Sequence, residues 1–169
     1  MMRPVMVPFA FLLASACAAV PQTAAEYREH FKGNAKPFGG TAQERTVDRP
    51  FQAVVADVRV NADRCFNVVT RHQRRSELGP GQVPGSTTYR SATRTTGAAT
   101  AEMTIQMDIV AGNQEPPGGY FVVLADVEGV TPSRTRVVVY GPDLSAWSDA
   151  LGSVITWASG RKRQCPELP

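Results

Sequence analysis

The chain has 169 residues, which is enough for one domain with a substantial apolar core. Its 18 lysines and arginines exceed its 15 aspartates and glutamates by too little to indicate nucleic-acid binding. Beyond Met6 no stretch is apolar enough for a transmembrane helix.

The first 16 residues are typical of an export signal. Arg3 supplies a positive charge, and the apolar residues 4–14 are too few to span a bilayer, which takes roughly 20. The segment Leu13-Ala14-Ser15-Ala16-Cys17 resembles the lipobox of bacterial lipoproteins. Cleavage after residue 16 would leave 153 of the 169 residues, beginning at a Cys17 that carries a diacylglycerol.

The residue after Cys17 bears on the compartment. Lipoproteins with Asp at that position tend to stay in the inner membrane, whereas Ala18 follows here. The resemblance therefore implies a lipid anchor in the bacterial outer membrane, on its periplasmic face. The alternative is an ordinary secretory signal that is cut after Ala16, Ala18 or Ala19.

Two further cysteines, Cys65 and Cys165, remain in the mature chain. An exported protein meets an oxidising compartment, so the pair predicts a disulfide. A loop of 100 residues corresponds to about 4–5 kcal/mol in the chain-entropy model. The competing interpretation, a catalytic thiol, would need His30 or His72 as its partner.

Residues 17–40 are expected to form a lipidated N-terminus and a flexible tether, since Pro21, Pro37 and the Gly39-Gly40 pair break regular structure. A short helix over residues 24–31 is possible within it. Residues 41–169 are predicted to form a single periplasmic α+β domain that begins with a strand over 41–47.

The next segment predicts one helix over residues 48–73. Asp48 is a plausible N-cap, and Pro50 suits the first turn. The apolar positions step by three and four residues along one helix face: Phe51, Val54, Val55, Val58, Ala62, Cys65 and Val69. Four basic side chains would then lie near the helix C-terminus: Arg71, His72, Arg74 and Arg75. The rival interpretation is a strand over residues 51–60.

Four strands and a helix complete the prediction. The strands cover residues 87–95, 101–109, 120–127 and 134–140, and 101–109 alternates apolar and polar residues as a half-buried strand does. The last helix covers residues 143–158, with Gly160 suited to its C′ position and Gly152 to a close approach to the sheet. The fold class is therefore α+β, an antiparallel sheet of four to five strands with two helices on one face.

This order of strand, helix, four strands and helix is similar to helix-grip folds, including that of BamC in the outer-membrane assembly machinery. The chain also resembles a group of short proteobacterial lipoproteins. The resemblance rests on Arg49-Pro50-Phe51, Cys65, Tyr140-Gly141-Pro142, Trp157-Ala158-Ser159-Gly160 and Cys165-Pro166. These motifs are structural, so they imply a fold and a compartment but no activity.

No catalytic or cofactor-binding signature occurs, and His30 and His72 are isolated, so neither a metal site nor a cofactor is predicted. Asp126 and Glu128 share a strand face, which could serve acid–base chemistry but is more typical of a solvated strand end. The leading hypothesis is a non-enzymatic, lipid-anchored binding or assembly module of the envelope.

Two surfaces are candidates for binding. If Cys65 joins Cys165, two basic clusters meet in one patch, suited to an envelope protein or to lipopolysaccharide. The patch comprises Arg64, Arg71, Arg74, Arg75, Arg161, Lys162 and Arg163. Alternatively, Met103 and Met107, near Trp147, would line a cleft that carries a small apolar ligand or lipid.

Overall fold

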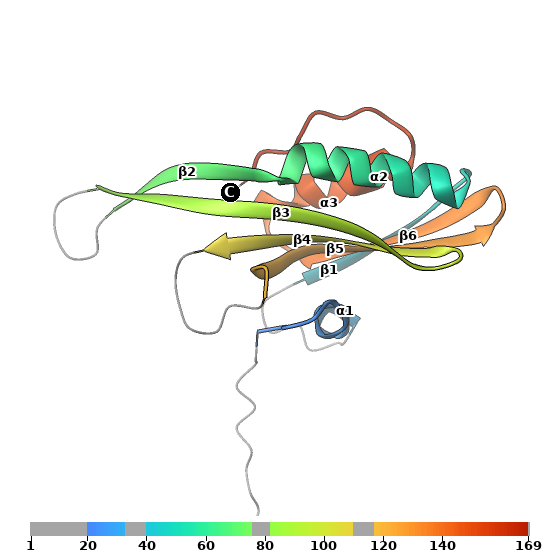
Figure 1. Cartoon of the computed structure of the whole chain (residues 1–169), viewed down its shortest axis with the longest axis horizontal. Helices are drawn as coiled ribbons and strands as arrows, with labels where there is room; N and C mark the ends of the chain where they lie inside the picture. The colour runs from blue at the N-terminus through green and yellow to red at the C-terminus, as the bar shows by residue number, and fades with distance from the viewer. Residues whose placement is uncertain (1–19, 33–39, 76–81, 110–116, 169) are drawn as a thin grey trace, which may run out of the picture.

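The computed structural model describes residues 20–32, 40–75, 82–109 and 117–168, so Cys17 and the predicted export signal lie outside it. The described residues form an α+β fold of three helices and six strands (Figure 1). In chain order they are α1 (Ala24–Lys32), β1 (Gly40–Val47), α2 (Phe51–Phe66), β2 (Val68–Arg75), β3 (Gln82–Gly97), β4 (Thr100–Ile109), β5 (Tyr120–Thr131), β6 (Arg134–Pro142) and α3 (Ser145–Ala158).

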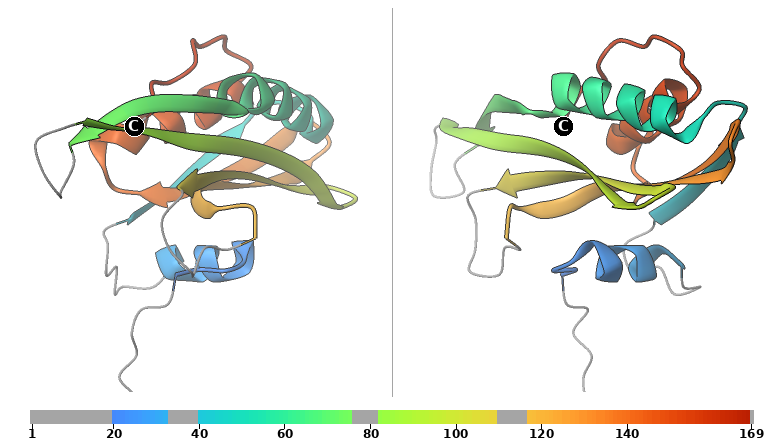
Figure 2. Two further views of the ribbon diagram at one scale, coloured as in Figure 1. Left: turned by 60° about the vertical axis from the view of Figure 1, so that its left-hand side comes forward. Right: turned by 45° about the vertical axis from the view of Figure 1, so that its right-hand side comes forward.

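The six strands form one antiparallel sheet in the order β1-β6-β5-β4-β3-β2. Helices α2 and α3 cover one face, and α1 lies on the other (Figures 1 and 2). The two helices predicted on one face are therefore present, as α2 and α3, whereas the predicted number of four to five strands was wrong. The sheet has a sixth strand, and a third helix covers its second face.

The extra strand arises because the predicted helix over residues 48–73 ends early, at Phe66. Asn67 leaves the helical conformation, with φ −93° and ψ 67°, and the β-branched Val68-Val69-Thr70 then pairs with β3. The helix also begins later than expected: Pro50 is the N-cap, and Asp48 pairs with Arg134 instead. The predicted apolar face is otherwise confirmed, since its members from Phe51 to Cys65 are buried.

The main core lies between the sheet and the α2–α3 layer. Phe66 of α2 meets Trp157 of α3 edge to face, with ring centroids 5.9 Å apart. Tyr89 of β3 meets Trp147 in the same way at 6.0 Å. Alternate residues of β4, including Met103 and Ile105, complete this core from below. Helices α2 and α3 therefore belong to the same packed unit as the sheet.

A second, smaller core holds α1 against the opposite face. Tyr27 and Phe31, one helical turn apart, are buried with Leu124 and Tyr140. The Tyr27 hydroxyl donates a hydrogen bond of 2.8 Å to the carbonyl of Val122. The short helix considered within residues 17–40 is thus present, and over residues 24–32 the chain packs on the sheet rather than acting as a tether.

Candidate functional site

The predicted disulfide between Cys65 and Cys165 is present, with the two Cα atoms 5.2 Å apart. Cys65 lies in the last turn of α2, and Cys165 lies in the tail that follows α3. The bond closes a loop of sequence separation 100 and holds the C-terminal tail against the helix layer. Because the tail carries three consecutive basic residues, the disulfide also determines where these charges lie.

Four basic side chains converge there from two parts of the chain. Two adjoining hollows, of about 330 and 470 Å³, share Arg64 of α2 with Lys162 and Arg163 of the tail. Arg161 lines the smaller hollow as well. We call this surface the basic groove and define it by Arg64, Arg161, Lys162 and Arg163.

The end of α3 explains why the tail returns to α2. Gly160 has φ +74°, a left-handed conformation that suits glycine, and the amides of Gly160 and Arg161 donate to the carbonyls of Trp157 and Thr156. This Schellman motif confirms Gly160 as the C′ residue. Arg49 reinforces the turn, since its Nη1 donates to the carbonyl of Ala158 at 3.1 Å.

The tail also explains Gly152, which was expected to allow a close approach to the sheet. A Cβ at Gly152 would lie 3.1 Å from Nη1 of Arg163. The close neighbour is therefore the C-terminal tail. Lack of a side chain at this position lets Arg163 lie across α3.

Only part of the positive charge in this region is neutralised. Asp57 pairs with Arg49 at 2.8 Å, and Asp149 pairs with Arg163 at 3.2 Å. Arg161 and Lys162 are exposed, and neither forms an ion pair with any residue that the structure describes. The groove thus carries uncompensated positive charge that an anion could neutralise.

Arg64 forms hydrogen bonds that help to hold the groove together. Its Nη2 donates to Oδ1 of Asn61 at 3.0 Å and, more weakly, to the carbonyl of Arg163 at 3.4 Å. These two bonds join α2 to the tail beside the disulfide. Arg64 therefore serves partly as structure, whereas Arg161 and Lys162 are the residues best placed to meet a partner.

Arg71, another member of the predicted basic patch, does not join this groove. Residues 71–75 lie in β2 instead of the end of a helix, and the side chains of Arg74 and Arg75 lie outside the described part of the structure. Val68 pairs with Tyr89, whose ring is in the main core, so by strand alternation Val69 and Arg71 face the α1 side. The exposure of Val69, at 59 %, agrees with this orientation.

A partly buried ion cluster, which the sequence analysis missed, connects α1 with the sheet. Arg28 donates from Nε and Nη2 to the two carboxylate oxygens of Asp126, both at 2.7 Å, and Nη2 also donates to Glu102. Arg94 of β3 donates to the other oxygen of Glu102 at 2.8 Å. We call these four residues, Arg28, Arg94, Glu102 and Asp126, the α1 ion cluster.

Burial and ion pairing change the pKa values of side chains in and beside this cluster. Glu102 is only 4 % exposed, although strand alternation had placed it on a solvated face. The hydrogen bond to Asp126, followed by that to Glu102, raises the pKa of Arg28 above its ordinary value, and burial raises that of the neighbouring Tyr27. The sequence contains one signal for this contact: Tyr27 and Phe31 lie one helical turn apart and form an apolar helix face, which needs a surface of the sheet to cover.

The expected carboxylate pair, Asp126 and Glu128, is divided between two arginines. Asp126 binds Arg28, whereas Glu128 accepts a hydrogen bond of 2.5 Å from Nη2 of Arg136. The latter bond is the main cause of a raised pKa at Arg136. Each carboxylate thus has a cationic partner, which is the arrangement of structural ion pairs.

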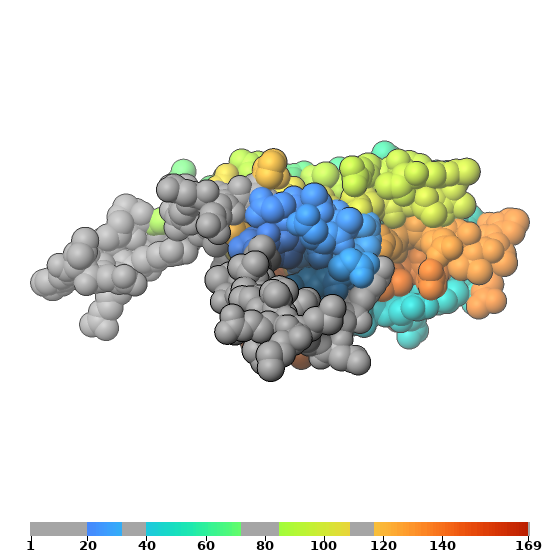
Figure 3. Space-filling view, turned by 90° about the horizontal axis from the view of Figure 1, so that it is seen from below, coloured from blue at the N-terminus to red at the C-terminus, as the bar shows by residue number. Residues whose placement is uncertain are grey.

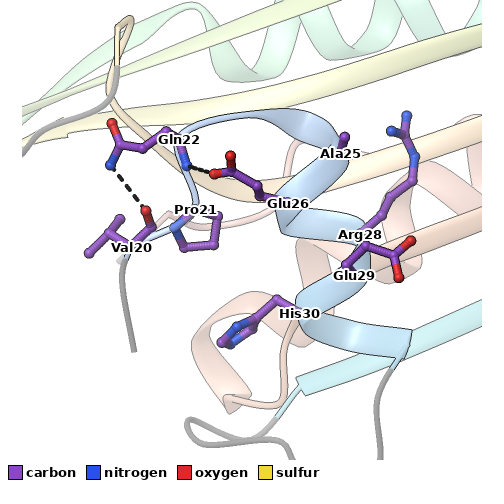
Figure 4. A pocket seen from close by; sticks show the side chains of 8 residues that line it. All are labelled: Val20, Pro21, Gln22, Ala25, Glu26, Arg28, Glu29 and His30. Carbon is purple, nitrogen blue, oxygen red and sulfur yellow. Dashed lines mark hydrogen bonds between the residues drawn. The ribbon is translucent and has the colours of Figure 1, made fainter. Parts of the chain in front are cut away.

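A third surface is a shallow groove of about 800 Å³ along the outer side of α1 (Figure 4). Two hydrogen bonds fix the start of α1. Thr23 Oγ1 accepts one from the amide of Glu26 at 3.2 Å, and the Glu26 carboxylate accepts the other from the amide of Gln22 at 2.7 Å. The lining residues are Val20, Pro21, Gln22, Ala25, Glu26, Arg28, Glu29 and His30.

The residues proposed to line a ligand cleft, in contrast, lie in or against the main core. Met103 is fully buried, Trp147 packs on Tyr89, and Met107 is partly buried beside them. Among the described residues no group of three or more potential metal ligands occurs. None of the helices in that part of the chain is long and apolar enough to cross a membrane.

No protein-family model matches the sequence, and no curated protein matches it either. The fold is similar to a crystal structure of a hypothetical protein from Helicobacter pylori, with 12% identity, a TM-score of 0.40, and coverage of 75% of this chain and 88% of that one. It is also similar to Ara h 8.0201, with 12% identity, a TM-score of 0.34, and coverage of 72% and 94%. At these TM-scores neither match indicates a shared function.

Proposed function

We propose that this chain is a lipid-anchored protein of the bacterial cell envelope that binds an anionic envelope component through the basic groove, without catalysing a reaction. The observation that carries the proposal is the disulfide, because it holds Arg161 and Lys162 beside Arg64. Arg161 and Lys162 have no carboxylate partner among the described residues. Phosphate and carboxylate groups are the natural ligands of such a surface.

The anchor is proposed from the sequence of residues 13–17, which resembles a lipobox. Growing cells that receive an alkyne fatty acid should label the protein, and a Cys17→Ser variant should lose the label. Full labelling of that variant would overturn the anchor. From β1 onward, the order of a strand, a helix, further antiparallel strands and a final helix supports the proposed helix-grip arrangement.

The groove can be tested by charge reversal. We expect Arg161→Glu/Lys162→Glu to weaken binding of purified lipopolysaccharide roughly tenfold at low ionic strength, with a smaller loss as salt is added. The matched control is Arg45→Glu/Arg71→Glu, which reverses two exposed arginines without ion pairs among the described residues. Titration of each variant against the same preparation compares them directly.

The control variant should bind lipopolysaccharide as tightly as the wild type does. Both double variants should keep the melting temperature of the wild type, since exposed charges contribute little to stability. Equal binding by the wild type and Arg161→Glu/Lys162→Glu would exclude the groove as the binding surface. The alternative function, a carrier of a small apolar ligand, gains no support from Met103 and Trp147, whose side chains pack within the core.

A further inference from the structure

The position of α1 bears on how the domain would sit on its membrane. Val20 is three residues from Cys17, and three residues of fully extended chain reach roughly 10 Å. The start of α1 is fixed by the bonds among Gln22, Thr23 and Glu26. The helix itself is fixed on the sheet by Tyr27 and Phe31 and by the α1 ion cluster.

We propose that α1 and the sheet face beside it lie against the bilayer that holds the lipid, so that the basic groove points away from that bilayer. This inference rests on the lipid anchor of the proposed function and adds an orientation to it. The surface that meets the headgroups comprises the outer side of α1 and the neighbouring part of β3, which are seen together in Figure 3.

The dimensions of the fold decide between the two possible orientations. The groove belongs to the α2–α3 layer, on the opposite side of the sheet from α1 (Figures 1 and 2). Two helix layers of about 10 Å each and the sheet between them separate the outer surfaces by roughly 30 Å. A linker of roughly 10 Å cannot bring the far surface to the same bilayer while α1 stays in place.

Electrostatic attraction alone would favour the opposite orientation, with the basic groove on anionic lipid. It amounts to about 1 kcal/mol for each basic residue at the surface and decays over a Debye length of about 8 Å. That range is much shorter than the separation of the two faces. The covalent restraint therefore overrides the charge of the groove.

The charge of the α1 face suits a zwitterionic headgroup layer. Helix α1 exposes Glu26 and Glu29, and β3 exposes Arg90 and Arg94 beside it on the same sheet face. Side chains of both signs can meet the ammonium and phosphate groups of such lipids. A partner of the basic groove would consequently approach from the aqueous side.

Tryptophan fluorescence tests the orientation without new thiols. The lipidated protein, purified from membranes, is placed in zwitterionic vesicles that contain a phospholipid with a nitroxide on its headgroup. Ala25→Trp adds a reporter on exposed α1, and Val60→Trp adds a matched one on α2, where Val60 is 62 % exposed. The native Trp147 and Trp157 are buried and form a common background.

We expect Ala25→Trp to lose most of its added emission, whereas Val60→Trp keeps its own. Equal quenching of the two reporters, or stronger quenching at Val60, in protein that mass spectrometry shows to be acylated would overturn the orientation and leave the anchor intact. Protein without an acyl group on Cys17 would overturn the anchor and the orientation with it.

A release variant provides a second arm. Tyr27→Ala/Arg28→Ala/Phe31→Ala removes the apolar, hydrogen-bonded and ionic contacts of α1 described above. Residues 17–39 could then reach roughly 80 Å if fully extended. In this background the Val60→Trp reporter should become quenched to an extent similar to Ala25→Trp. Protection of Val60 that persists after release would contradict the role given to α1.

Discussion

The two faces of the sheet are covered by different means. On one face α2 and α3 bury a continuous apolar core, and the disulfide closes it at its C-terminal end. On the other face α1 rests on a small cluster of Tyr27, Phe31, Leu124 and Tyr140, supplemented by the α1 ion cluster. The difference indicates that the first face carries global stability, whereas α1 can open at a lower free energy.

The largest difference should come from truncating one phenylalanine on each face. Phe66→Ala removes a fully buried ring that packs on Trp157 and should lower the free energy of unfolding by about 3–5 kcal/mol. Phe31→Ala should cost less globally and should raise hydrogen exchange mainly in α1. Urea unfolding and hydrogen exchange measure the two effects; equal global losses would contradict the comparison.

The loss of the disulfide should have the second-largest effect on the free energy of unfolding. A Cys65→Ser/Cys165→Ser variant should lose about 2–5 kcal/mol, because its unfolded chain is no longer constrained by the long loop. Wild-type protein unfolded under reducing conditions is the control and should behave like the variant. Hydrogen exchange of α1 should change little below the global transition, since the bond lies in the other layer. A midpoint that does not respond to reductant would contradict this assignment.

The smallest predicted effect concerns the ion pairs on the α1 side. Glu102→Gln removes the buried charge that Arg28 and Arg94 share and should cost about 1–3 kcal/mol. Glu128→Gln alters a pair with Arg136 in which both side chains are nearly half exposed, and it should cost at most about 1 kcal/mol. If chemical unfolding gives the same loss of free energy for both variants, the burial of Glu102 has no energetic importance.

Local sequence patterns were sufficient to predict most of the sheet and the helices α2 and α3. The alternation in residues 101–109 predicted β4 because successive side chains of a strand point to opposite faces. The three-and-four spacing from Phe51 to Cys65 predicted the buried face of α2 in the same direct way. The cysteine pair followed from its number and the expected compartment. Each inference needed only neighbouring residues or a count.

The position of Arg71 in the predicted basic patch could not be obtained from local sequence patterns. Val69 continued the helical spacing, yet Val68-Val69-Thr70 also suits a strand, and the choice depended on pairing with β3, about 20 residues later. Once β2 formed, alternation turned Arg71 to the α1 face, away from Arg64. The predicted patch was therefore divided by a register that no local pattern contains.

The sequence by itself determined the α+β class, most element positions, the disulfide and the expectation of an export signal, because composition, periodicity and cysteine number are local or global properties of the chain. Only the tertiary structure decided that α1 docks on the sheet and that Glu102 is buried. These features depend on Tyr27 and Arg28 meeting partners 74 to 98 positions away. Such contacts form only when the strands are already in register, since the sheet creates the surface that α1 recognises.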